Sequence, residues 1–476
     1  MNWRLFPAFC TALLTFVVGC NVGPDYRAPN TSTPAHWETP PTTMGSLTVQ
    51  EPIEIEQWWT TFHDPMLDSL VQRAIVSNLD LEAATQRVRQ ARATVGIARA
   101  GIFPSVNSNA SYSRSGSGRS DDQDLWQAGA DAAWELDIFG GIRRSVESAK
   151  AGFQASVEDR RNVLITVLGE VATDYILLRG FQQEILIAQQ NLDVQARNLS
   201  TTREKKTLGT GTDLDIAQAE AQVASTTAAI ENQEANEQQT MYAISILLGL
   251  PPTTLESELM PQAPIPQPPL ILPVGLPSDL LRRRPDIRRA ERQLAAATAQ
   301  IGVATADLFP KFSLTGNLSV GGNNFPALGN WANRSWSFGP SASWTVFDAG
   351  AIRSNIEIQN ALQAQSFTAY KQTVLIALQE VQNALVVYDR EQRRRAALSI
   401  AVAANQRAVE LSTRRYKQGL TDFLSVLVAE GSLFGSQDSL VQSNRNIGTD
   451  AVALYKALGG GWEIGEQIPT TRAAEH

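Results

Sequence analysis

Four segments of the chain alternate apolar and polar residues with a period of two, the pattern of a β-strand that has one apolar face. In LWQAGADAAWELD, every second side chain is apolar, and Trp126 and Trp134 bracket three alanines of that row. In WSFGPSASWTVF, Trp336 and Trp344 bracket small residues in the same way. The strands are expected at about residues 105–114, 125–137, 311–320 and 336–347. The first two are separated by SGSGRSDDQD, residues 115–124, whose composition predicts a loop.

Two long stretches without proline, rich in Ala, Gln, Glu and Leu, follow these strand pairs and predict long helices. They run from Ile142 to about Leu208 and from Ile352 to about Gln418, roughly 100 Å each at the rise of an α-helix. Short turns at residues 208–215 and 418–424 lead into second helices that run back, and Gly211 and Gly419 are the expected helix stops. Antiparallel hairpins with a mild apolar stripe are typical of coiled coils and need neighbours on their apolar side.

The sequence repeats itself. Residues 78–104 align without gaps on residues 284–310, and both segments share an Asp, four alanines, a Gly and a final Phe-Pro. The repeat predicts that each half builds helices, two strands and a long helical hairpin. The predicted domains are a signal peptide at 1–19, an N-terminal segment at 20–64, repeat 1 at 65–250, a proline-rich linker at 251–276, repeat 2 at 277–460 and a C-terminal tail at 461–476. The composition of the linker predicts an extended surface connector.

The first residues have the features of a secretory signal. One positive residue, Arg4, precedes an apolar run from Leu5 to Val18, which is shorter than the roughly 20 residues needed to span a bilayer. The ending VVGC resembles a bacterial lipobox, in which Cys20 becomes the lipid-modified first residue of the mature protein. An ordinary signal with an incidental cysteine is the alternative. In lipoproteins of this kind, Asn21 after the cysteine implies onward sorting to the outer membrane.

Charge and composition argue against several function classes. The formal net charge is -8, and no basic patch is interleaved with aromatic residues, so nucleic-acid binding is not expected. The exception, RRRPDIRR at residues 282–289, is interpreted as the solvated start of a helix. Removal of the signal takes Cys10 away and leaves Cys20 without a partner for an internal disulfide.

The sequence contains no catalytic or metal-binding motif. The three histidines, His36, His63 and His476, are scattered, and Walker, HExxH and GxSxG motifs are absent. The chain is therefore expected not to be an enzyme and to hold no metal and no cofactor apart from covalent lipid on Cys20.

The apolar face of the strands is expected to meet lipid rather than a protein core. Strands of about ten to thirteen residues suit a tilted bilayer crossing, and tryptophans near strand ends are typical of the membrane interface. A soluble sandwich, the alternative, needs bulky Val, Ile and Leu on its inner faces. Four strands cannot close a barrel, since the smallest transmembrane barrels use about eight and an open edge leaves backbone groups unpaired in lipid. Several chains would then have to share one barrel.

Five strings occur in order along the chain: CNVGPDYRAP, LLGLPP, LPSDLLRRRPDIRRAE, IGVATADLFPKFSLTG and YKALGGGW. Together they resemble the TolC-like outer-membrane factor family, in its lipoprotein branch, over nearly the whole mature chain. The resemblance implies a mainly α-helical homotrimer with a membrane β part. Four strands per protomer would form a shared twelve-stranded β-barrel, continued by a twelve-helix periplasmic α-barrel. The implied location is the outer membrane, with a lipid anchor and an extension into the periplasm.

Members of this family are passive exit ducts of tripartite efflux pumps. The resemblance therefore implies two partners, a periplasmic membrane-fusion adaptor protein and an inner-membrane RND-type transporter, besides outer-membrane lipid. The cargo would be small toxic compounds. Two alternatives stay open. One is an export duct for proteins in a type I secretion system; the other is a periplasmic coiled-coil scaffold lipoprotein, for which the four amphipathic strands would be surplus.

The resemblance also implies a resting gate at the tips of the hairpins, made by one set of side chains per protomer. The gate candidates are Asp213, Asp215, Asp422, Leu424, Val428 and Glu430. Three-fold symmetry would turn each acidic residue into a ring of like charges that attracts cations, and Leu424 matches an apolar constriction. For Asp213 and Asp422, capping of a helix N-terminus is the alternative.

The chain departs from the family pattern at this gate. Where related channels have an aspartate followed three residues later by an arginine, VLVAEGSL has Val428 and Gly431. Val428 therefore predicts a more apolar constriction that opens more easily. The adaptor is expected to contact the two tips, with a plain inter-helix turn as the alternative. The tip residues are Thr210, Gly211, Thr212, Gly419, Leu420 and Thr421.

Overall fold

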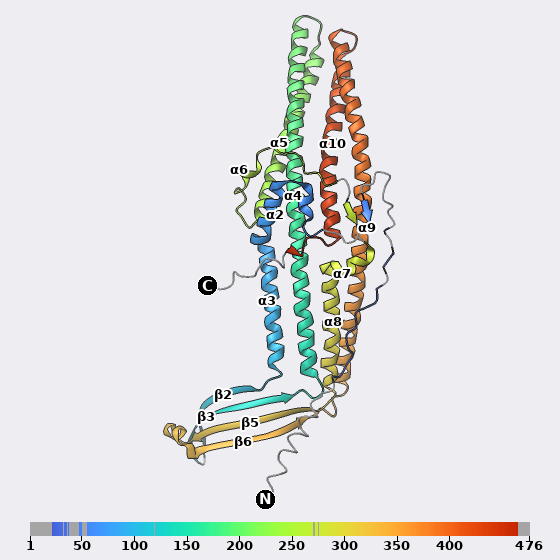
Figure 1. Cartoon of the computed structure of the whole chain (residues 1–476). Helices are drawn as coiled ribbons and strands as arrows, with labels where there is room; N and C mark the ends of the chain where they lie inside the picture. Colours follow the sequence, from blue (N-terminus) through green and yellow to red (C-terminus); the bar gives the residue numbers. More distant parts are fainter. Residues whose placement is uncertain are drawn as a thin grey trace. The chain divides into compact units, whose positions relative to one another are not determined.

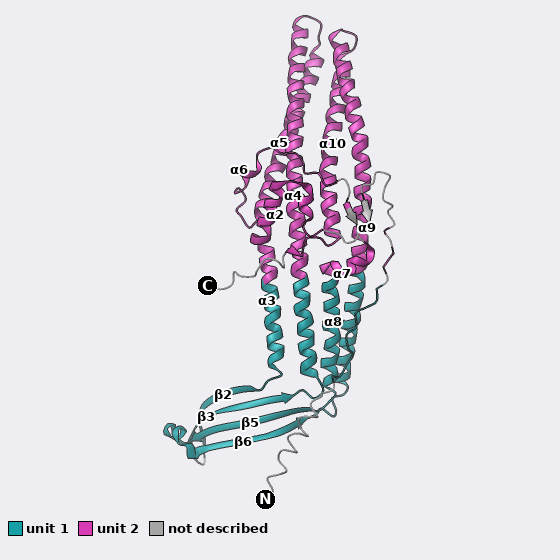
Figure 2. Cartoon of the chain, viewed as in Figure 1, with its two compact units in different colours: residues 1–31, 86–158, 288–373 teal, residues 32–85, 159–287, 374–476 magenta. Residues whose placement is uncertain are grey.

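The structure is a computed structural model that describes residues 21–31, 33–35, 37, 47–49, 55–118, 120–269, 272–274 and 276–464. The predicted signal peptide, Cys20, His36, His476 and most of the predicted tail lie outside the described residues. The chain forms two compact units (Figure 2). Unit 1 comprises Met1–Thr31, Gln86–Glu158 and Arg288–Thr373, and unit 2 comprises Ser32–Thr85, Asp159–Ile287 and Val374–His476.

Helices make up most of the described residues (Figure 1). The α-helices are α2 (Pro65–Ser77), α3 (Leu79–Ala100), α4 (Gly141–Thr207), α5 (Asp213–Leu247), α6 (Glu256–Leu259), α7 (Leu280–Arg283), α8 (Pro285–Ala306), α9 (Ala351–Lys417) and α10 (Phe423–Ala457). The 3-10 helices are η1 (Trp58–Phe62), η2 (Pro277–Asp279), η3 (Phe325–Gly329) and η4 (Trp331–Asn333). None of the helices in the described residues combines the length and the hydropathy needed to cross a membrane.

One series of elements occurs twice along the chain. α3 and α8 have 22 residues each, α4 and α9 have 67 each, and α5 and α10 have 35 each. A pair of strands stands between the first and the second helix of each series. The two long helices begin and end within one residue of the bounds expected from the sequence.

Unit 1 contains a four-stranded antiparallel sheet in the order β2-β3-β5-β6. Its strands are β2 (Ser105–Ser117), β3 (Ser120–Leu136), β5 (Lys311–Gly322) and β6 (Arg334–Ser343). The register sets Ala130 of β3 opposite Leu318 of β5, and Leu318 opposite Trp336 of β6. Because side chains alternate between the faces of a strand, this register collects the apolar rows of the strands on one face.

The apolar face of this sheet is exposed. Val106 and Trp336 are each 72% exposed, and Phe338 is 70% exposed. Burial in a protein core would stabilise each such side chain by about 1.5–3 kcal/mol, so a soluble sandwich would cover them. The second sheet in the described residues, β1 (Leu47–Val49) paired with β4 (Leu272–Val274), belongs to unit 2 and is too small to do so.

The opposite face of the sheet is polar. Asn107 Nδ2 donates to Asp131 Oδ2 at 3.3 Å. The hydroxyls of Ser313 and Ser341 lie 2.8 Å apart across the β5–β6 pair. Cross-strand polar pairs of this kind stabilise a wet face, so the two faces of the sheet are suited to different media.

Two tryptophans are fixed where helices meet the sheet. Trp134 Nε1 donates to the carbonyl of Ile102 at 2.8 Å, and Trp344 Nε1 donates to the carbonyl of Leu308 at 3.0 Å. Both indole rings therefore lie at the helical end of the sheet, where a membrane interface would be expected.

The predicted loop at residues 115–124 is wrong. β2 continues to Ser117 and β3 begins at Ser120, so most of this segment is strand. Arg114 pairs with Asp122 at 3.1 Å across the two strands, and such opposite charges stabilise the pair where apolar residues run out. Gly and Ser composition misled the prediction, because the partner strand was not visible in the local pattern.

The predicted fourth strand also needs correction, since β6 ends at Ser343 and not near residue 347. The chain leaves the sheet there to begin α9. Asp348 accepts hydrogen bonds from the N–H groups of Gly350 at 2.9 Å and Ile352 at 2.7 Å, which caps the helix. The capping requirement ends the strand, although the alternating pattern continues through Trp344.

The N-terminal segment packs against α4 and α8 within unit 1. Arg144 of α4 has a side chain only 2% exposed and forms an ion pair with Asp25 at 2.8 Å. Tyr26 donates its hydroxyl hydrogen to Glu291 of α8 at 2.9 Å. The segment that begins at Asn21 is thus fixed by charged and polar contacts along its path.

Unit 2 has an aromatic core between η1 and α10. Trp58, Trp59 and Tyr455 are fully or almost fully buried. Trp58 stacks on Tyr455 with ring centroids 5.3 Å apart. Ring stacking adds to the burial of apolar area, so this core fixes η1 to the end of α10.

The RRRPDIRR segment is not simply a solvated helix start. Arg284 is buried and donates to the carbonyl of Ala457 at 2.9 Å. Its guanidinium also pairs with Asp286 at 2.6 Å and Glu380 at 2.7 Å. An arginine can be buried when its donors are all matched in this way, and sequence composition alone does not reveal such partners.

The predicted extended linker at residues 251–276 is only partly extended. It contains α6 and β4, and Leu259 and Leu272 are buried. Arg179 of α4 donates to the carbonyl of Pro261 at 2.7 Å. The linker is therefore packed within unit 2, since its few leucines are buried in a way that a proline count does not show.

We expect Leu318→Arg to destabilise the protein in a bilayer by about 2–4 kcal/mol, the cost of arginine on a lipid-facing strand near the midplane. Asn317→Arg, one residue away on the polar face, should change the stability by less than about 1 kcal/mol. Denaturant titration of both variants in lipid vesicles measures the two costs. Equal costs would show that the apolar face does not meet lipid.

Candidate functional site at the helical-hairpin tips

Each of the two helical hairpins of unit 2 closes through a short turn, and the two turns match. Gly209 follows α4 with φ of 75°, and Gly419 follows α9 with φ of 70°. In this left-handed conformation glycine avoids the strain that other residues bear. In both turns, the N–H of the next residue donates at 2.9 Å to the carbonyl five residues earlier. The two hairpins therefore close by the same helix-ending motif.

Gly211 is not the helix stop that the sequence suggested. Gly209 takes that role, and Gly211 lies two residues further on, where a Cβ would come within 2.9 Å of the backbone nitrogen of Lys206. The string LGTGT offers two glycines, and only the geometry of the turn distinguishes the one that ends the helix.

The acidic gate candidates of the first tip are engaged in a helix cap and an ion pair. Thr212 Oγ1 accepts from the N–H of Asp215 at 3.1 Å, and the N–H of Thr212 donates to Asp215 Oδ2 at 3.1 Å, which forms a capping box. Asp213 forms an ion pair with Lys206 of α4. Both carboxylates lie beside the N-terminus of α5, where the helix dipole favours negative charge.

The second tip uses a single carboxylate in the same place. Asp422 Oδ1 accepts from the N–H of Ser425 at 3.1 Å and from its hydroxyl at 2.6 Å. These hydrogen bonds lower the pKa of Asp422, because they stabilise the charged form. The capping alternative thus describes contacts that the structure contains for Asp422, whereas Asp213 lies in the first turn of α5 and pairs with Lys206.

Apolar side chains are exposed beside these caps. Leu424 is 50% exposed and Val428 is 61% exposed, one turn apart on the same face of α10. Leu420 in the turn itself is 64% exposed. The six expected adaptor-contact residues are exposed or half-buried: Thr210, Gly211, Thr212, Gly419, Leu420 and Thr421.

A small apolar cluster joins the two hairpins just behind the tips. Phe423 and Val426 of α10 are buried against Ala219 of α5. Tyr416 of α9 packs on Phe423 with ring centroids 5.3 Å apart. The amine of Lys205 lies 3.5 Å from the centroid of the Tyr416 ring and donates to its carbonyl at 3.1 Å. All four helices of the hairpins therefore meet at this cluster.

Further from the tips, α4 and α10 meet through polar pairs that recur every seven residues of α4. We call these pairs the polar seam: Glu184 with Arg445, Asn191 with Gln437, and Asn198 with Glu430. The first ion pair is 3.2 Å and the second hydrogen bond is 3.1 Å. A seven-residue spacing keeps side chains on one face of a coiled-coil helix, so the seam is a continuous strip.

Glu430 belongs to this seam rather than to the exposed part of the tip. It is 7% exposed, and Asn198 Nδ2 donates to its Oε1. Its Oε2 has no hydrogen-bond partner in the described part of the chain. Burial raises the pKa of Glu430 to about 6. A partner on α4 covers Glu430, so a gate role for this carboxylate stays a prediction that requires this contact to open.

Glu184, at the other end of the seam, is also hard to ionise. Burial raises its pKa to about 7, although Arg445 opposes the shift and Asp438 adds to it. The seam residues of α4 were missed in the sequence, but a signal was present. Glu184, Asn191 and Asn198 interrupt the apolar stripe at a regular interval of seven.

No group of three or more His, Cys, Asp or Glu side chains placed to hold a metal ion occurs in the described residues. The tips offer caps and exposed apolar side chains, and a polar strip that is buried or half-buried lies behind them. Such a site can close, open or dock.

Comparisons with known proteins identify the family. The family described as "Outer membrane efflux protein" matches residues 70–250 and 276–460. "Nodulation protein T" of Rhizobium leguminosarum bv. trifolii is 33% identical over 465 residues, which cover 96% of this chain and 98% of that protein. "Solvent efflux pump outer membrane protein SrpC" of Pseudomonas putida is 33% identical over 490 residues, covering 98% and 100%.

Solved structures agree with these relatives. The outer-membrane channel OprN superposes with a TM-score of 0.86 at 37% identity, covering 93% of this chain and all of that chain. The open state of the MtrE outer membrane channel of Neisseria gonorrhoeae gives a TM-score of 0.81 at 28% identity, covering 93% and 99%. The chain therefore belongs to the outer membrane efflux protein family, and it is an outer-membrane exit duct of a tripartite efflux system.

Proposed function

We propose that three copies of this chain form one channel, in which twelve strands close a β-barrel and twelve helices continue it into the periplasm. Each chain would supply two structural repeats. One observation carries the proposal: the sheet of unit 1 has an exposed apolar face, and its outer strands β2 and β6 each have a free edge among the described residues. An open edge in lipid costs several kcal/mol per unpaired backbone group. Pairing β6 of one copy with β2 of the next removes all free edges.

The channel would receive small toxic compounds from a periplasmic adaptor and an inner-membrane RND-type transporter and pass them outward without catalysing a reaction. Names of relatives support this cargo class: SrpC is named for solvent efflux, and "Pyoverdine export outer membrane protein OpmQ" of Pseudomonas aeruginosa is 34% identical. Lipid on Cys20 would anchor each copy. The protein-export alternative is not what these names indicate, and a scaffold would leave the apolar face of the sheet without a role.

The gate of this channel would be apolar rather than acidic. Asp213, Asp215 and Asp422 serve as caps or ion-pair partners, so their charge is already matched by helix N-termini or by Lys206. Leu424 and Val428 have no such role and are exposed. Three copies of these two side chains would make two stacked apolar rings, which gate by excluding water.

The same tips would dock the adaptor, and the polar seam would link docking to opening. The seam and the tip cluster both hold α10 against α4 near the tips. A buried polar contact fixes register but adds little stability compared with apolar packing. An adaptor that pulls on the tips would therefore meet less resistance along the seam than along an apolar interface.

The protein extracted from outer membranes in mild detergent should have the mass of three chains, once bound detergent is subtracted. Light scattering coupled to size-exclusion chromatography makes this measurement. A single chain that stays soluble without detergent after removal of its lipid would exclude the channel and support the scaffold.

Val428→Asp should add a ring of three carboxylates beside Leu424, so it should increase cation preference and change the conductance of single channels in planar bilayers. Thr227→Asp, at an exposed position of α5, is the control and should leave both quantities as in the parent protein. Unchanged recordings for Val428→Asp would remove Val428 from the gate.

Glu430→Gln should change the pH dependence of stability in a defined window. Because the folded pKa of about 6 lies above the ordinary 4.5, the folded state holds the proton more tightly. The parent therefore loses stability relative to the variant as pH rises from about 4.5 through 6, by about 2 kcal/mol in total. Denaturant titrations of both proteins between pH 4 and pH 7 test this.

The control for this titration is Glu410→Gln, at an exposed position of α9. It should not reproduce the effect. A constant difference between Glu430→Gln and the parent across the window would show that Glu430 is solvated in the assembled protein.

A further inference from the structure

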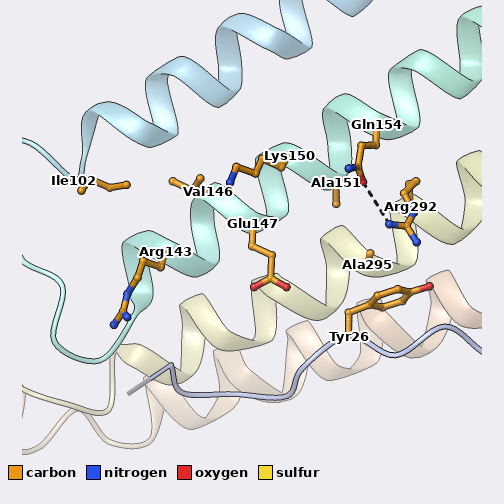
Figure 3. A pocket seen from close by; sticks show the side chains of 10 residues that line it. All are labelled: Tyr26, Ile102, Arg143, Val146, Glu147, Lys150, Ala151, Gln154, Arg292 and Ala295. Carbon is orange, nitrogen blue, oxygen red and sulfur yellow. Dashed lines mark hydrogen bonds between the residues drawn. The ribbon is translucent and has the colours of Figure 1, made fainter. Parts of the chain in front are cut away.

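A cavity of about 430 Å³ lies in unit 1 between α4, α8 and the N-terminal segment. Its apolar lining includes Val146, Ala151 and Ala295, which are all buried. The aromatic ring of Tyr26 lies on the side of the N-terminal segment, and Ile102 lies at the end of α3 (Figure 3). The cavity therefore combines an apolar wall with a rim of polar and charged side chains.

Most of the charged groups at the rim are already matched. Arg143 pairs with Asp137 at 3.1 Å. Glu147 pairs with Arg144 at 2.8 Å. Arg292 contacts Glu291 and donates to Gln154 at 3.4 Å, the bond drawn in Figure 3. These side chains shape the cavity, but their charges are already neutralised by partners within the chain.

Lys150 is the exception. It is exposed, it lines the cavity, and within the described part of the chain it has no ion-pair or hydrogen-bond partner. In Figure 3, Lys150 lies on the side of α4 toward α3, whereas Glu147 extends toward α8. An unmatched ammonium group at an apolar cavity favours a ligand with an anionic head and an apolar body.

The neighbouring helix adds positive charge. Between Gln86 and Ala100, α3 carries four arginines and no acidic residue, in a chain whose net charge is negative. These arginines give this part of α3 a positive charge, and their attraction for anions falls off within about a Debye length, roughly 8–10 Å at physiological salt.

The cavity lies beside the expected membrane interface. Ile102, which lines it, accepts the indole hydrogen bond of Trp134 at 2.8 Å. The N–H of Val22 donates to the carbonyl of Phe139, at the corner between β3 and α4, at 3.2 Å. A lipid on Cys20 would be attached two residues before Val22. Aromatic side chains and lipid attachment both mark the level of the headgroups.

We propose that this cavity binds the headgroup of an anionic phospholipid from the periplasmic leaflet of the outer membrane. The phosphate lies against Lys150, and the glycerol and the first part of an acyl chain lie against Tyr26 and Ile102. A headgroup that carries its own ammonium group should bind less tightly, because that cation is repelled by Lys150 and by the arginines of α3. The proposal rests on the outer-membrane location of the strands and extends the proposed function to a specific lipid contact.

Native mass spectrometry of the full-length assembly tests the proposal. Detergent-purified protein is titrated with phosphatidylglycerol and, separately, with phosphatidylethanolamine of the same acyl chains. We expect tighter binding of phosphatidylglycerol, and Lys150→Gln should weaken it about tenfold, the effect of one lost charge-assisted contact. Lys150→Arg should keep the preference. Lys371→Gln, a lysine of α9 that does not line the cavity, is the control.

Three results would overturn the proposal: equal affinity for both lipids, unchanged phosphatidylglycerol affinity in Lys150→Gln, or displacement of the lipid by equimolar glycerol 3-phosphate. The last result would show that a soluble phosphate is the ligand. The same spectra report the number of chains. A trimer without lipid preference rejects only this site, whereas the absence of a trimer rejects the proposed function.

Discussion

The unpaired edges of the four-stranded sheet are the constraint on which the rest of the molecule depends. β2 and β6 each present backbone groups that no described strand satisfies, while the apolar face between them is exposed. Water can hydrogen-bond to the backbone groups at the edges but leaves the apolar face exposed to solvent. Lipid can cover the apolar face but cannot hydrogen-bond to the edges. Further strands in the same membrane would meet both demands, as they do in the proposed shared barrel. In that assembly, the helices that continue from the sheet would follow the symmetry of the barrel.

The polar seam shows what such an assembly asks of its helices. Apolar packing along the whole of α4 and α10 would be more stable, since buried polar pairs recover little beyond their desolvation cost. Glu184, Asn191 and Asn198 nevertheless recur at one interval, and each finds a partner on α10. The pairs specify one register of α4 against α10. They also allow the two helices to separate, because each polar side chain can then hydrogen-bond to water in place of its partner. A contact that is specific but weak is what a helix pair needs if it must part and return.

Periodicity made most of the fold predictable. The alternation with a period of two predicted the strands. The long stretches without proline predicted the ends of α4 and α9 to within one residue. The failures have a common cause, since each depends on a specific side-chain contact that composition does not show. Arg114 pairs with Asp122 across the segment predicted as a loop, Asp348 caps α9 just after β6 ends, and Arg284 is buried against Glu380, far along the chain. At the tips, types of residue were found but not their roles: Glu430 is covered by Asn198, and Gly209, not Gly211, ends the helix.

The roles of the tip carboxylates bear on how such a duct chooses what it carries. A charge that caps a helix is held by that helix and is not free to meet a passing solute. Asp215 and Asp422 are held in this way, which leaves Leu424 and Val428 as the exposed side chains of α10 beside the turn. An apolar constriction selects by width and wetting, and it does so alike for many solutes. In the proposed channel, selection would then occur before the solute arrives, in the transporter, and the tips would need only to open at the right time. The proposed apolar gate is consistent with relatives whose names refer to cargoes as different as solvents and pyoverdine.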